Sequence, residues 1–203
     1  MPKDGSQTRE RILDAANTLF LQRGITASSI DRIAKSSGLT KGSFFYHFKD
    51  KDELILALVE RFAEMDRQQY TQALEKVERL STSQDALQKL LLFVGVFVDQ
   101  FSGLDEPPAC LYAAYLYENG IVSPASMKIV NEAMHFWRDK MSALINAALI
   151  EHEMKITVDV ASLADMFTAT LEGAFLMSQI LKDTTITSQQ LKHYQTYLSL
   201  LFK

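Results

Sequence analysis

A short run of small and polar residues between positions 40 and 43 has the composition of a surface that reads DNA. Thr40 and Ser43 supply hydroxyl groups, Lys41 supplies a cation, and Gly42 has no side chain. Duplex DNA accepts a helix in its major groove, and small side chains at the start of that helix let it approach base edges closely. The chemistry that these four residues indicate is therefore contact with a nucleic acid.

Such residues must lie at the start of a helix, and the surrounding sequence predicts this arrangement. Ser28, three residues before Asp31, has the spacing of a capping box and predicts the start of a short second helix. Gly38 predicts a tight turn after that helix, because glycine tolerates a positive φ. Thr40 predicts the N-cap of a third helix that ends near Phe48. Two short helices joined by a turn containing glycine form a helix-turn-helix.

Apolar residues at helical spacing predict helices along the rest of the chain as well. A first helix of about four turns ends near Arg23-Gly24, and a long amphipathic helix runs from Lys51 to about Arg79. Proline, glycine and short polar segments divide the sequence after Ser81 into further apolar helices. We expect these helices to span residues 83–101, 109–118, 124–153, 158–182 and 188–202.

The composition agrees with an all-α fold. Of the 203 residues, 47% are hydrophobic and 23% are charged, so the chain can bury a core. Only 8 Gly and 4 Pro argue against a turn-rich all-β design. The longest apolar run, Leu90–Val98, is far shorter than the roughly 20 residues needed to cross a bilayer, so no membrane partner is expected. Together with the periodicity, these features predict an all-α fold of about nine helices.

Charge is distributed unevenly along the chain. Residues 1–51 carry nine Lys or Arg and five Asp or Glu, a net +4, whereas the whole chain carries −4 and the remainder therefore −8. A basic end on an acidic protein indicates that this end meets a polyanion. The single cysteine, Cys110, excludes an internal disulfide and a cysteine-built zinc cage. With a polar N-terminal segment and no apolar leader, we expect the protein in the reducing cytoplasm.

The sequence from position 7 to 62, and above all residues 30–54, resembles the N-terminal DNA-binding region of TetR-family transcriptional regulators. The resemblance implies an all-helical homodimer. A helix-turn-helix domain of three small helices (1–50) binds DNA, a fourth helix (51–80) connects, and a larger helical bundle (81–203) binds a small-molecule inducer and forms the dimer. The function implied is ligand-responsive transcription regulation. Such a protein is usually a repressor, bound to a near-palindromic operator in double-stranded DNA and released from it by the inducer.

The resemblance also implies which residues contact DNA. They lie on the recognition helix, at the start of the fourth helix and at the start of the second helix. In that order they are Thr40, Lys41, Gly42, Ser43, Tyr46, His47, Lys51, Ser28 and Ser29. One departure from the family matters, because the family usually has tyrosine at the position of Phe45. Phe45 has no hydroxyl to donate to a phosphate, so we assign that role to Tyr46 or His47.

Aromatic residues, methionines and two polar residues in the second half suggest a ligand cavity, although each aromatic residue alone is more typical of a core. The candidate ligand-binding residues are Phe93, Phe97, Cys110, Tyr115, Met134, Trp137, Phe167 and Glu172. Cys110 and Glu118, like residues 172–177, also resemble segments of the family. We favour Cys110 as a buried small hydrophobe over a sensor of oxidants or electrophiles. Glu172 is a helix–helix anchor, a pocket residue or an exposed side chain.

The last two expected helices are apolar beyond a single stripe, which predicts burial on more than one side. We expect them to pair with the same helices of a second copy in a four-helix interface. The expected interface residues are Phe175, Leu191, Tyr194, Leu198 and Leu201.

The alternative to a regulator is a helical enzyme or redox sensor that acts through Cys110, or an enzyme that uses a His/Glu pair. Catalysis requires a nucleophile and a base brought together, and the sequence has neither a glycine-rich phosphate loop nor a nucleophile elbow. Glu153 follows His152, but Ile156 occupies the position at which a zincin has its second histidine. We therefore expect no enzyme activity, no catalytic residue, no cofactor and no metal site.

Overall fold

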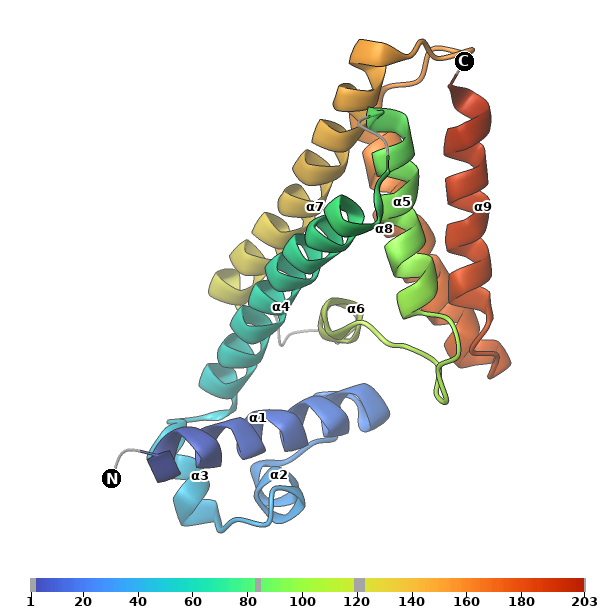
Figure 1. Ribbon diagram of the computed structural model, residues 1–203. Coiled ribbons are helices and arrows are strands. Elements are labelled where there is room, and N and C mark those ends of the chain that lie inside the picture. The colour runs from blue at the N-terminus through green and yellow to red at the C-terminus, as the bar shows by residue number, and fades with distance from the viewer. Residues whose placement is uncertain (1–2, 83–84, 119–122, 203) are drawn as a thin grey trace. The chain divides into compact units, whose positions relative to one another are not determined.

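A computed structural model gives the fold, and it describes residues 3–82, 85–118 and 123–202. Over these residues the chain is all-α, as the sequence predicts, apart from an isolated bridge between Met154 and Phe202 (Figure 1). The first helix is longer than the expected four turns, with 21 residues, and the other helix boundaries fall within a few residues of those expected. The nine helices of the described residues are α1 (Lys3–Arg23), α2 (Ile30–Ser36), α3 (Lys41–His47), α4 (Lys51–Leu80), α5 (Ala86–Gln100), α6 (Leu111–Leu116), α7 (Pro124–Glu151), α8 (Val160–Leu181) and α9 (Ile186–Leu201).

The chain divides into two compact units. The head unit comprises residues 1–65 and 110–131, and the body unit comprises residues 66–109 and 132–203. Helices α4 and α7 each have one end in the head unit and the other in the body unit. The short helix α6 comes from the second half of the sequence, yet it belongs to the same unit as α1, α2 and α3.

Helices α2 and α3 form the expected helix-turn-helix. In the turn between them Gly38 has a φ of +69°, a conformation that favours glycine. Thr40 caps α3 as predicted, because its Oγ1 accepts a hydrogen bond from the backbone N–H of Ser43 at 3.1 Å. The expected cap of α2 is wrong by one residue. Ser29, and not Ser28, accepts the capping hydrogen bond, at 3.3 Å.

The core of the head unit holds these two helices against α1. Phe44 and Phe48 lie four positions apart, a spacing that places both on one face of a helix, and both point inward, with exposed fractions of 0% and 1%. Their ring centroids lie 5.8 Å apart. Other fully buried apolar residues of the unit include Ile12, Leu13, Ala16, Phe20, Ile33, Leu54 and Leu58. Burial of this apolar surface is the main force that fixes α3 in the unit.

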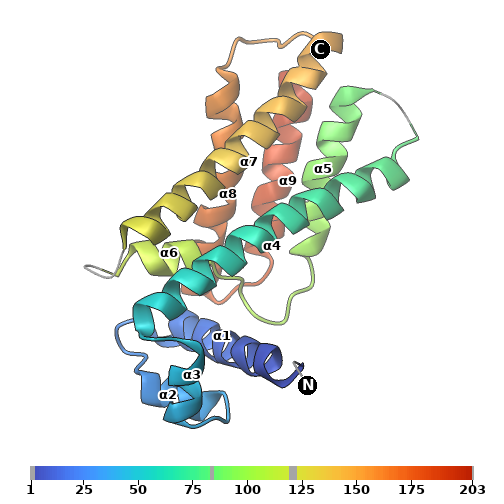
Figure 2. The same cartoon turned by 90° about the vertical axis from the view of Figure 1, so that its left-hand side faces the viewer.

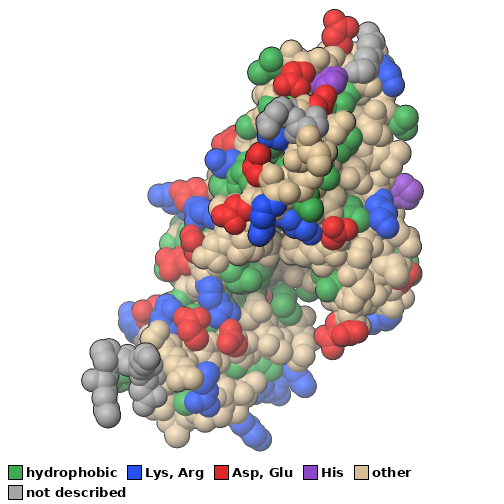
Figure 3. Space-filling view, in the orientation of Figure 1, with side chains coloured by type: hydrophobic (Ala, Val, Ile, Leu, Met, Phe, Trp, Pro, Cys, Tyr) green, Lys and Arg blue, Asp and Glu red, His purple; other side chains and the backbone are tan. Residues whose placement is uncertain are grey.

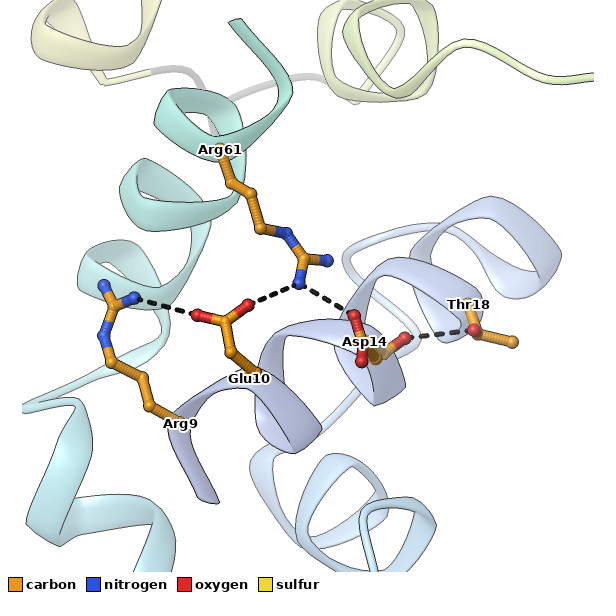
Figure 4. A network of polar contacts seen from close by, with 5 residues as sticks. All are labelled: Arg9, Glu10, Asp14, Thr18 and Arg61. Carbon is orange, nitrogen blue, oxygen red and sulfur yellow. Dashed lines mark hydrogen bonds and ion pairs between the residues drawn. The ribbon is translucent and has the colours of Figure 1, made fainter. Parts of the chain in front are cut away.

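A network of ion pairs fastens the first half of α4 to α1 (Figure 4). Arg61 of α4 donates to Glu10 at 3.1 Å and to Asp14 at 2.8 Å. Arg9 lies 3.9 Å from the second carboxylate oxygen of Glu10, and Thr18 donates to the backbone carbonyl of Asp14 at 3.0 Å. Because these side chains are partly exposed, we expect each pair to add little stability. Their main effect is to restrict the orientation of α4 on α1.

The core of the body unit is aromatic, and α5, α8 and α9 pack along their lengths around it (Figure 2). The ring of Phe97 lies at its centre, with centroid distances of 5.3 Å to Phe93, 5.7 Å to Trp137 and 5.4 Å to Phe167. All four rings are buried and tilted or edge-on to one another, the geometry that aromatic pairs prefer.

Four of the five residues expected at a dimer interface lie in this core instead. Their exposed fractions are 0–3%, and they are Leu191, Tyr194, Leu198 and Leu201. The hydroxyl of Tyr194 donates to the backbone carbonyl of Leu163 at 2.9 Å. The fifth residue, Phe175, is half-buried against Phe101, with centroids 5.2 Å apart. The spacing on α9 therefore reflects burial within one subunit, and the four core residues are not available to a second copy.

Helix α8 carries apolar residues on a second face, which is exposed. Leu176, Met177 and Ile180 have exposed fractions of 54%, 47% and 64%. Gly173 lies on the same face, and a Cβ built there would meet nothing within 4 Å. By length and hydropathy alone α8 is the one described helix that could span a membrane, which is weak evidence because core helices pass the same test. An exposed apolar stripe of this kind is typical of an interaction surface.

Candidate nucleic-acid interface

The first turn of α3 presents short side chains at the surface of the head unit. Thr40, Lys41 and Gly42 are exposed, and Ser43 is half-buried. The hydroxyl oxygens of Thr40 and Ser43 lie 3.0 Å apart, so each restricts the orientation of the other. The four residues that the sequence singles out thus share one surface at the start of a capped helix, the position from which a recognition helix contacts bases.

Gly42 is not required by the fold of this chain. Its φ lies outside the left-handed region, in contrast to Gly24 and Gly38. A Cβ at Gly42 would meet only Oγ1 of Thr40, at an ordinary van der Waals distance of 3.7 Å. Glycine within a helix costs about 1 kcal/mol relative to alanine. Close approach of another molecule is one of the uses of glycine at a position where the fold itself does not require it.

The second turn of α3 divides its aromatic residues between core and surface. Phe44 is buried, whereas Phe45 and Tyr46 have exposed fractions of 47% and 83%. The rings of Tyr46 and His47 meet edge to face, with centroids 5.0 Å apart. Tyr46 therefore presents a hydroxyl donor to solvent next to Phe45, which presents only hydrocarbon. This placement is compatible with the phosphate contact assigned to Tyr46 or His47.

The two serines before α2 differ in what they can contact. Ser29 is exposed, and its hydroxyl caps the helix. Ser28 is fully buried, and its hydroxyl donates to the backbone carbonyl of Gly24 at 2.8 Å. Ser28 therefore stabilises the turn between α1 and α2 and has no side-chain atom free at the surface. Its assignment as a DNA contact is corrected on this ground.

Lys51 starts α4, as its assigned role requires, and its ammonium group already has a protein partner. Nζ donates to the backbone carbonyl of Ile25 and lies 5.9 Å from the ring centroid of Phe20. Burial lowers the pKa of Lys51, and the neighbouring carboxylates of Glu118 and Asp52 oppose that shift. An ammonium group has three donors, so a bond to Ile25 leaves two for a phosphate.

Basic side chains surround this surface, and Figure 3 shows them projecting from the part of the head unit formed by α2 and α3. Lys41 pairs with Asp31 at 3.0 Å, with exposed fractions of 56% and 69% for the two side chains. Exposed ion pairs of this kind are weak. A phosphate can therefore compete with Asp31 for the ammonium group of Lys41.

Two sets of polar contacts in the head unit were not predicted from the sequence. Asp50 caps α4 by accepting from the Glu53 N–H at 2.9 Å, and Glu53 accepts from the Lys49 N–H at 2.6 Å. The Asp-x-x-Glu spacing is that of a capping box and could have predicted the Asp50 cap, although Glu53 accepts from Lys49 and not from Asp50 itself. Glu118, beyond the end of α6, contacts Thr26 in the turn between α1 and α2. No local pattern predicts this second contact, because the two residues are 92 positions apart.

The residues expected to bind a ligand are divided between the two units. Phe93, Phe97, Trp137 and Phe167 make up the aromatic core of the body unit. Cys110 and Tyr115 are buried in the head unit instead, where the Tyr115 hydroxyl accepts from the backbone N–H of Ser123 at 3.0 Å. Met134 and Glu172 of the body unit are half-buried, and Glu172 has an interaction partner.

Three potential metal ligands, Asp85, Glu151 and His152, place one ligand atom each within 4.8 Å of the others. His152 Nε2 lies 2.8 Å from an oxygen of Asp85, and Glu151 accepts from the Ala86 N–H at 3.0 Å. The backbone N–H of Gln88 is the main reason that the pKa of Asp85 lies below its usual value. These bonds tie the start of α5 to the end of α7, so packing accounts for the cluster.

An exposed, capped helix start that follows a tight turn, set in a head of three small helices with basic side chains, defines a helix-turn-helix DNA-binding protein. Two family models match the chain. The model for bacterial regulatory proteins of the tetR family matches residues 12–58, and the tetracyclin repressor-like C-terminal domain matches residues 86–194. The chain belongs to the TetR family of DNA-binding transcriptional regulators, and not to an enzyme family. The predictions of family, all-α fold and regulatory class are confirmed.

Curated relatives agree with this assignment. The HTH-type transcriptional regulator AcrR of Shigella flexneri is 44% identical over 52 residues, which cover 26% of this chain and 24% of AcrR. The HTH-type transcriptional repressor KstR2 of Mycolicibacterium smegmatis is 29% identical over 104 residues, 51% of this chain and 46% of KstR2. The probable regulator ArpR of Pseudomonas putida is 31% identical over 134 residues, 66% and 51%. The matches thus span a quarter to about half of each relative.

Solved structures share the fold over nearly the whole chain. A TetR regulator from Chloroflexus aurantiacus has a TM-score of 0.77 and 26% identity, covering 98% of each chain. A TetR-family regulator from Agrobacterium tumefaciens has a TM-score of 0.77 and 20% identity, covering 98% of this chain and 100% of the other. The reduced form of Escherichia coli NemR has a TM-score of 0.75 and 20% identity, covering 97% and 98%.

Proposed function

We propose that this TetR-family regulator is a cytoplasmic homodimer that represses transcription from a near-palindromic operator and is released by a small-molecule inducer. Two α3 helices enter successive major grooves of the operator, about one helical turn apart. The observation that carries this proposal is Gly42, because the protein's own fold leaves the missing side chain unexplained. Close approach of base edges to the start of α3 explains it.

Each side chain of the head unit then has a role that its exposure supports. Base edges lie against the first turn of α3, where Thr40 and Ser43 offer hydroxyls and Lys41 offers a cation. Tyr46 and Lys51 donate to phosphates and set the register of the helix on the duplex. The remaining members of the interface are Gly42, His47 and Ser29. Phosphate contacts supply affinity that falls steeply with salt, whereas the first turn of α3 supplies sequence preference.

The second copy covers the exposed face of α8. Met166, Gly173, Met177 and Ile180 follow one another at spacings of seven, four and three residues, so they share one side of the helix. A groove of about 380 Å³ lies between α8 and α9, lined by Gly173, Met177 and Ile186 among others. Small residues let two helices approach closely, and Gly173 has open space in front of it. A symmetric partner fits best, because a palindromic operator requires two identical heads.

The inducer binds in the body unit next to the aromatic core around Trp137 and Phe97. Rings at this density supply the apolar lining typical of small-molecule sites, once the packing opens to admit a ligand. A protein of the same fold from Saccharomonospora viridis, with a TM-score of 0.71 and 20% identity, was solved in complex with choline. The inducer lowers operator affinity only by its differential affinity for the two conformations of the dimer.

Selection from a library of random duplexes tests the proposal. We expect enrichment of a near-palindrome whose half-site centres lie about 10 base pairs apart, and a steep negative dependence of binding on salt concentration. The selected duplex then serves in gel-shift assays against a metabolite panel. Because Trp137 is the single tryptophan of the chain, its fluorescence reports ligand binding in the body unit directly. Failure to enrich any sequence, with binding that salt leaves unchanged, would contradict the proposal.

A further inference from the structure

Glu118 ties the end of α6 to the turn between α1 and α2 inside the head unit. Its carboxylate accepts from the backbone N–H of Thr26 at 3.1 Å and also from the Thr26 hydroxyl. Gly24, with a φ of +81°, lies against the same carboxylate, and a Cβ built there would collide with Oε1 of Glu118. The turn is therefore shaped to receive this carboxylate, because glycine leaves room and the next residues donate into it.

Lys51 completes the network from the start of α4. Its Nζ donates to the carbonyl of Ile25, the residue just before Thr26, and attracts the carboxylate of Glu118. The hydroxyl of Thr26 is the main cause that holds the pKa of Glu118 below its usual value, so the carboxylate is ionised at neutral pH. An anion from α6 and a cation from α4 thus hold the same short turn.

This turn leads directly into the DNA-reading helices. Ser29, three residues after Thr26, caps α2, and α2 packs against α3. The position of the turn therefore sets where α2 begins, and α2 in turn positions the first turn of α3. Lys51, the candidate phosphate contact, is held by the same turn. Glu118 therefore supports both the first turn of α3 and Lys51 through the turn, although it belongs to a segment outside the helix-turn-helix sequence.

We propose that Glu118 is a positioning residue for DNA binding, which holds the α1–α2 turn and thereby places α3 and Lys51 against the duplex without contacting DNA itself. The proposal rests on the proposed function. Through Glu118, the end of α6 contacts the turn that positions α3 and Lys51. A change in the position of Glu118 therefore changes the affinity for DNA.

The variant Glu118→Gln separates positioning from simple electrostatics. An acid near DNA repels phosphates, so loss of its charge alone would strengthen binding to every duplex. Positioning predicts the opposite result for the selected duplex, binding about tenfold weaker, because a neutral amide oxygen accepts from Thr26 more weakly than the carboxylate does. Binding to a scrambled duplex is expected to weaken less, because it depends on phosphate contacts such as that of Lys51 and not on base contacts at the first turn of α3. The control is Glu60→Gln, which removes the same charge from an exposed residue of α4 in the same unit and should not weaken binding.

Hydrogen exchange of the backbone amides of residues 24–29, measured without DNA, tests the hold on the turn separately. We expect exchange about tenfold faster in Glu118→Gln and unchanged in Glu60→Gln. Thr26→Val removes only the hydroxyl donor and should weaken binding to the selected duplex about threefold. The double variant should bind the selected duplex no more weakly than Glu118→Gln alone, because both changes affect the same contact between residues 26 and 118.

Each failure has its own signature. A wild-type protein that selects no duplex overturns the proposed function. A wild type that selects one, together with a Glu118→Gln variant that binds it equally well or more tightly, overturns only the role of Glu118. Unchanged exchange at residues 24–29, or additive effects of Thr26→Val and Glu118→Gln, also overturns it. If Glu118→Gln does not fold, Thr26→Val alone decides, and unweakened binding by that variant contradicts the proposal.

Discussion

The start of α3 and the exposed face of α8 both contain a glycine that one subunit does not need. Gly42 and Gly173 lack the positive φ of Gly24 and Gly38, and added Cβ atoms would meet ordinary contacts or open space. Their surroundings differ. Hydroxyls and a lysine surround Gly42, whereas exposed methionine, leucine and isoleucine surround Gly173. The first suits a hydrated polyanion and the second suits an apolar helix, which is why the proposed function assigns the two surfaces partners of opposite chemistry.

The variant Ile180→Glu tests the exposed apolar face of α8 as the dimer interface and should have the largest effect. A buried charge in each half of the interface prevents association, and a single head then loses the gain from binding two half-sites. We expect monomers in analytical ultracentrifugation and about 1,000-fold weaker binding to the selected duplex. Helical content should remain unchanged, because Ile180 has an exposed fraction of 64% in one subunit.

Ile150→Glu is the matched control for this change. Ile150 is 86% exposed and lies on α7, a different helix of the same unit. The control should remain a dimer and bind DNA as the wild type does. If Ile180→Glu also stays dimeric, the second copy does not cover the face of α8 and the interface lies elsewhere.

The variant Gly42→Leu tests the close approach of DNA to the first turn of α3. A side chain at this position separates α3 from the base edges in both half-sites, so we expect binding to the selected duplex to weaken about 100-fold. The melting temperature should rise, because replacing a helical glycine stabilises by roughly 0.5–1 kcal/mol where the new side chain has room. Gly42→Ala should raise it too, with a smaller loss of binding. Unchanged DNA binding by Gly42→Leu would show that the first turn of α3 does not approach the duplex.

The two regions also differ in how far the sequence could predict them. The head unit depends on local signals, and these identify the turn at Gly38, the cap at Thr40 and the inward side of Phe44 and Phe48. Ser28 shows the limit of such signals. Two adjacent serines can each cap a helix, and only the three-dimensional turn decides that Ser29 does so while Ser28 is buried.

In the body unit, the type of an apolar residue does not indicate whether its side chain is buried within one subunit or left exposed for a second copy. Leu198 and Ile180 are equally suited to an interface by type, yet the first is fully buried within one subunit and the second is exposed. A charged residue at Leu198 should therefore unfold the core rather than separate a dimer. Glu118 is invisible for a related reason, since its contact with Thr26 depends on a fold that joins distant segments.

The variant Lys51→Met sharpens the assignment of the phosphate contact. Methionine keeps most of the apolar stem over Phe20 and removes the charge. We expect binding about tenfold weaker to selected and scrambled duplexes alike, with a salt dependence shallower by about one ion per subunit. Lys49→Met, a neighbouring exposed cation, is the control for general loss of charge and should have a smaller effect. A weaker complex with an unchanged salt dependence would mean that Lys51 only supports the turn at Ile25.

The smallest effect is expected from restoring a hydroxyl at the position where the family usually has tyrosine. Phe45 is 47% exposed on α3, so the added hydroxyl of Phe45→Tyr reaches the surface without disturbing the core. If a phosphate lies in front of it, one hydrogen bond per subunit should strengthen binding roughly fivefold, whatever the sequence of the duplex. Tyr46→Phe removes the hydroxyl from the neighbouring residue and should weaken binding by a similar factor. In the double variant, the two changes should cancel if Tyr46 has taken over the contact. Strengthening by Phe45→Tyr with no loss from Tyr46→Phe would instead assign the existing phosphate contact to His47.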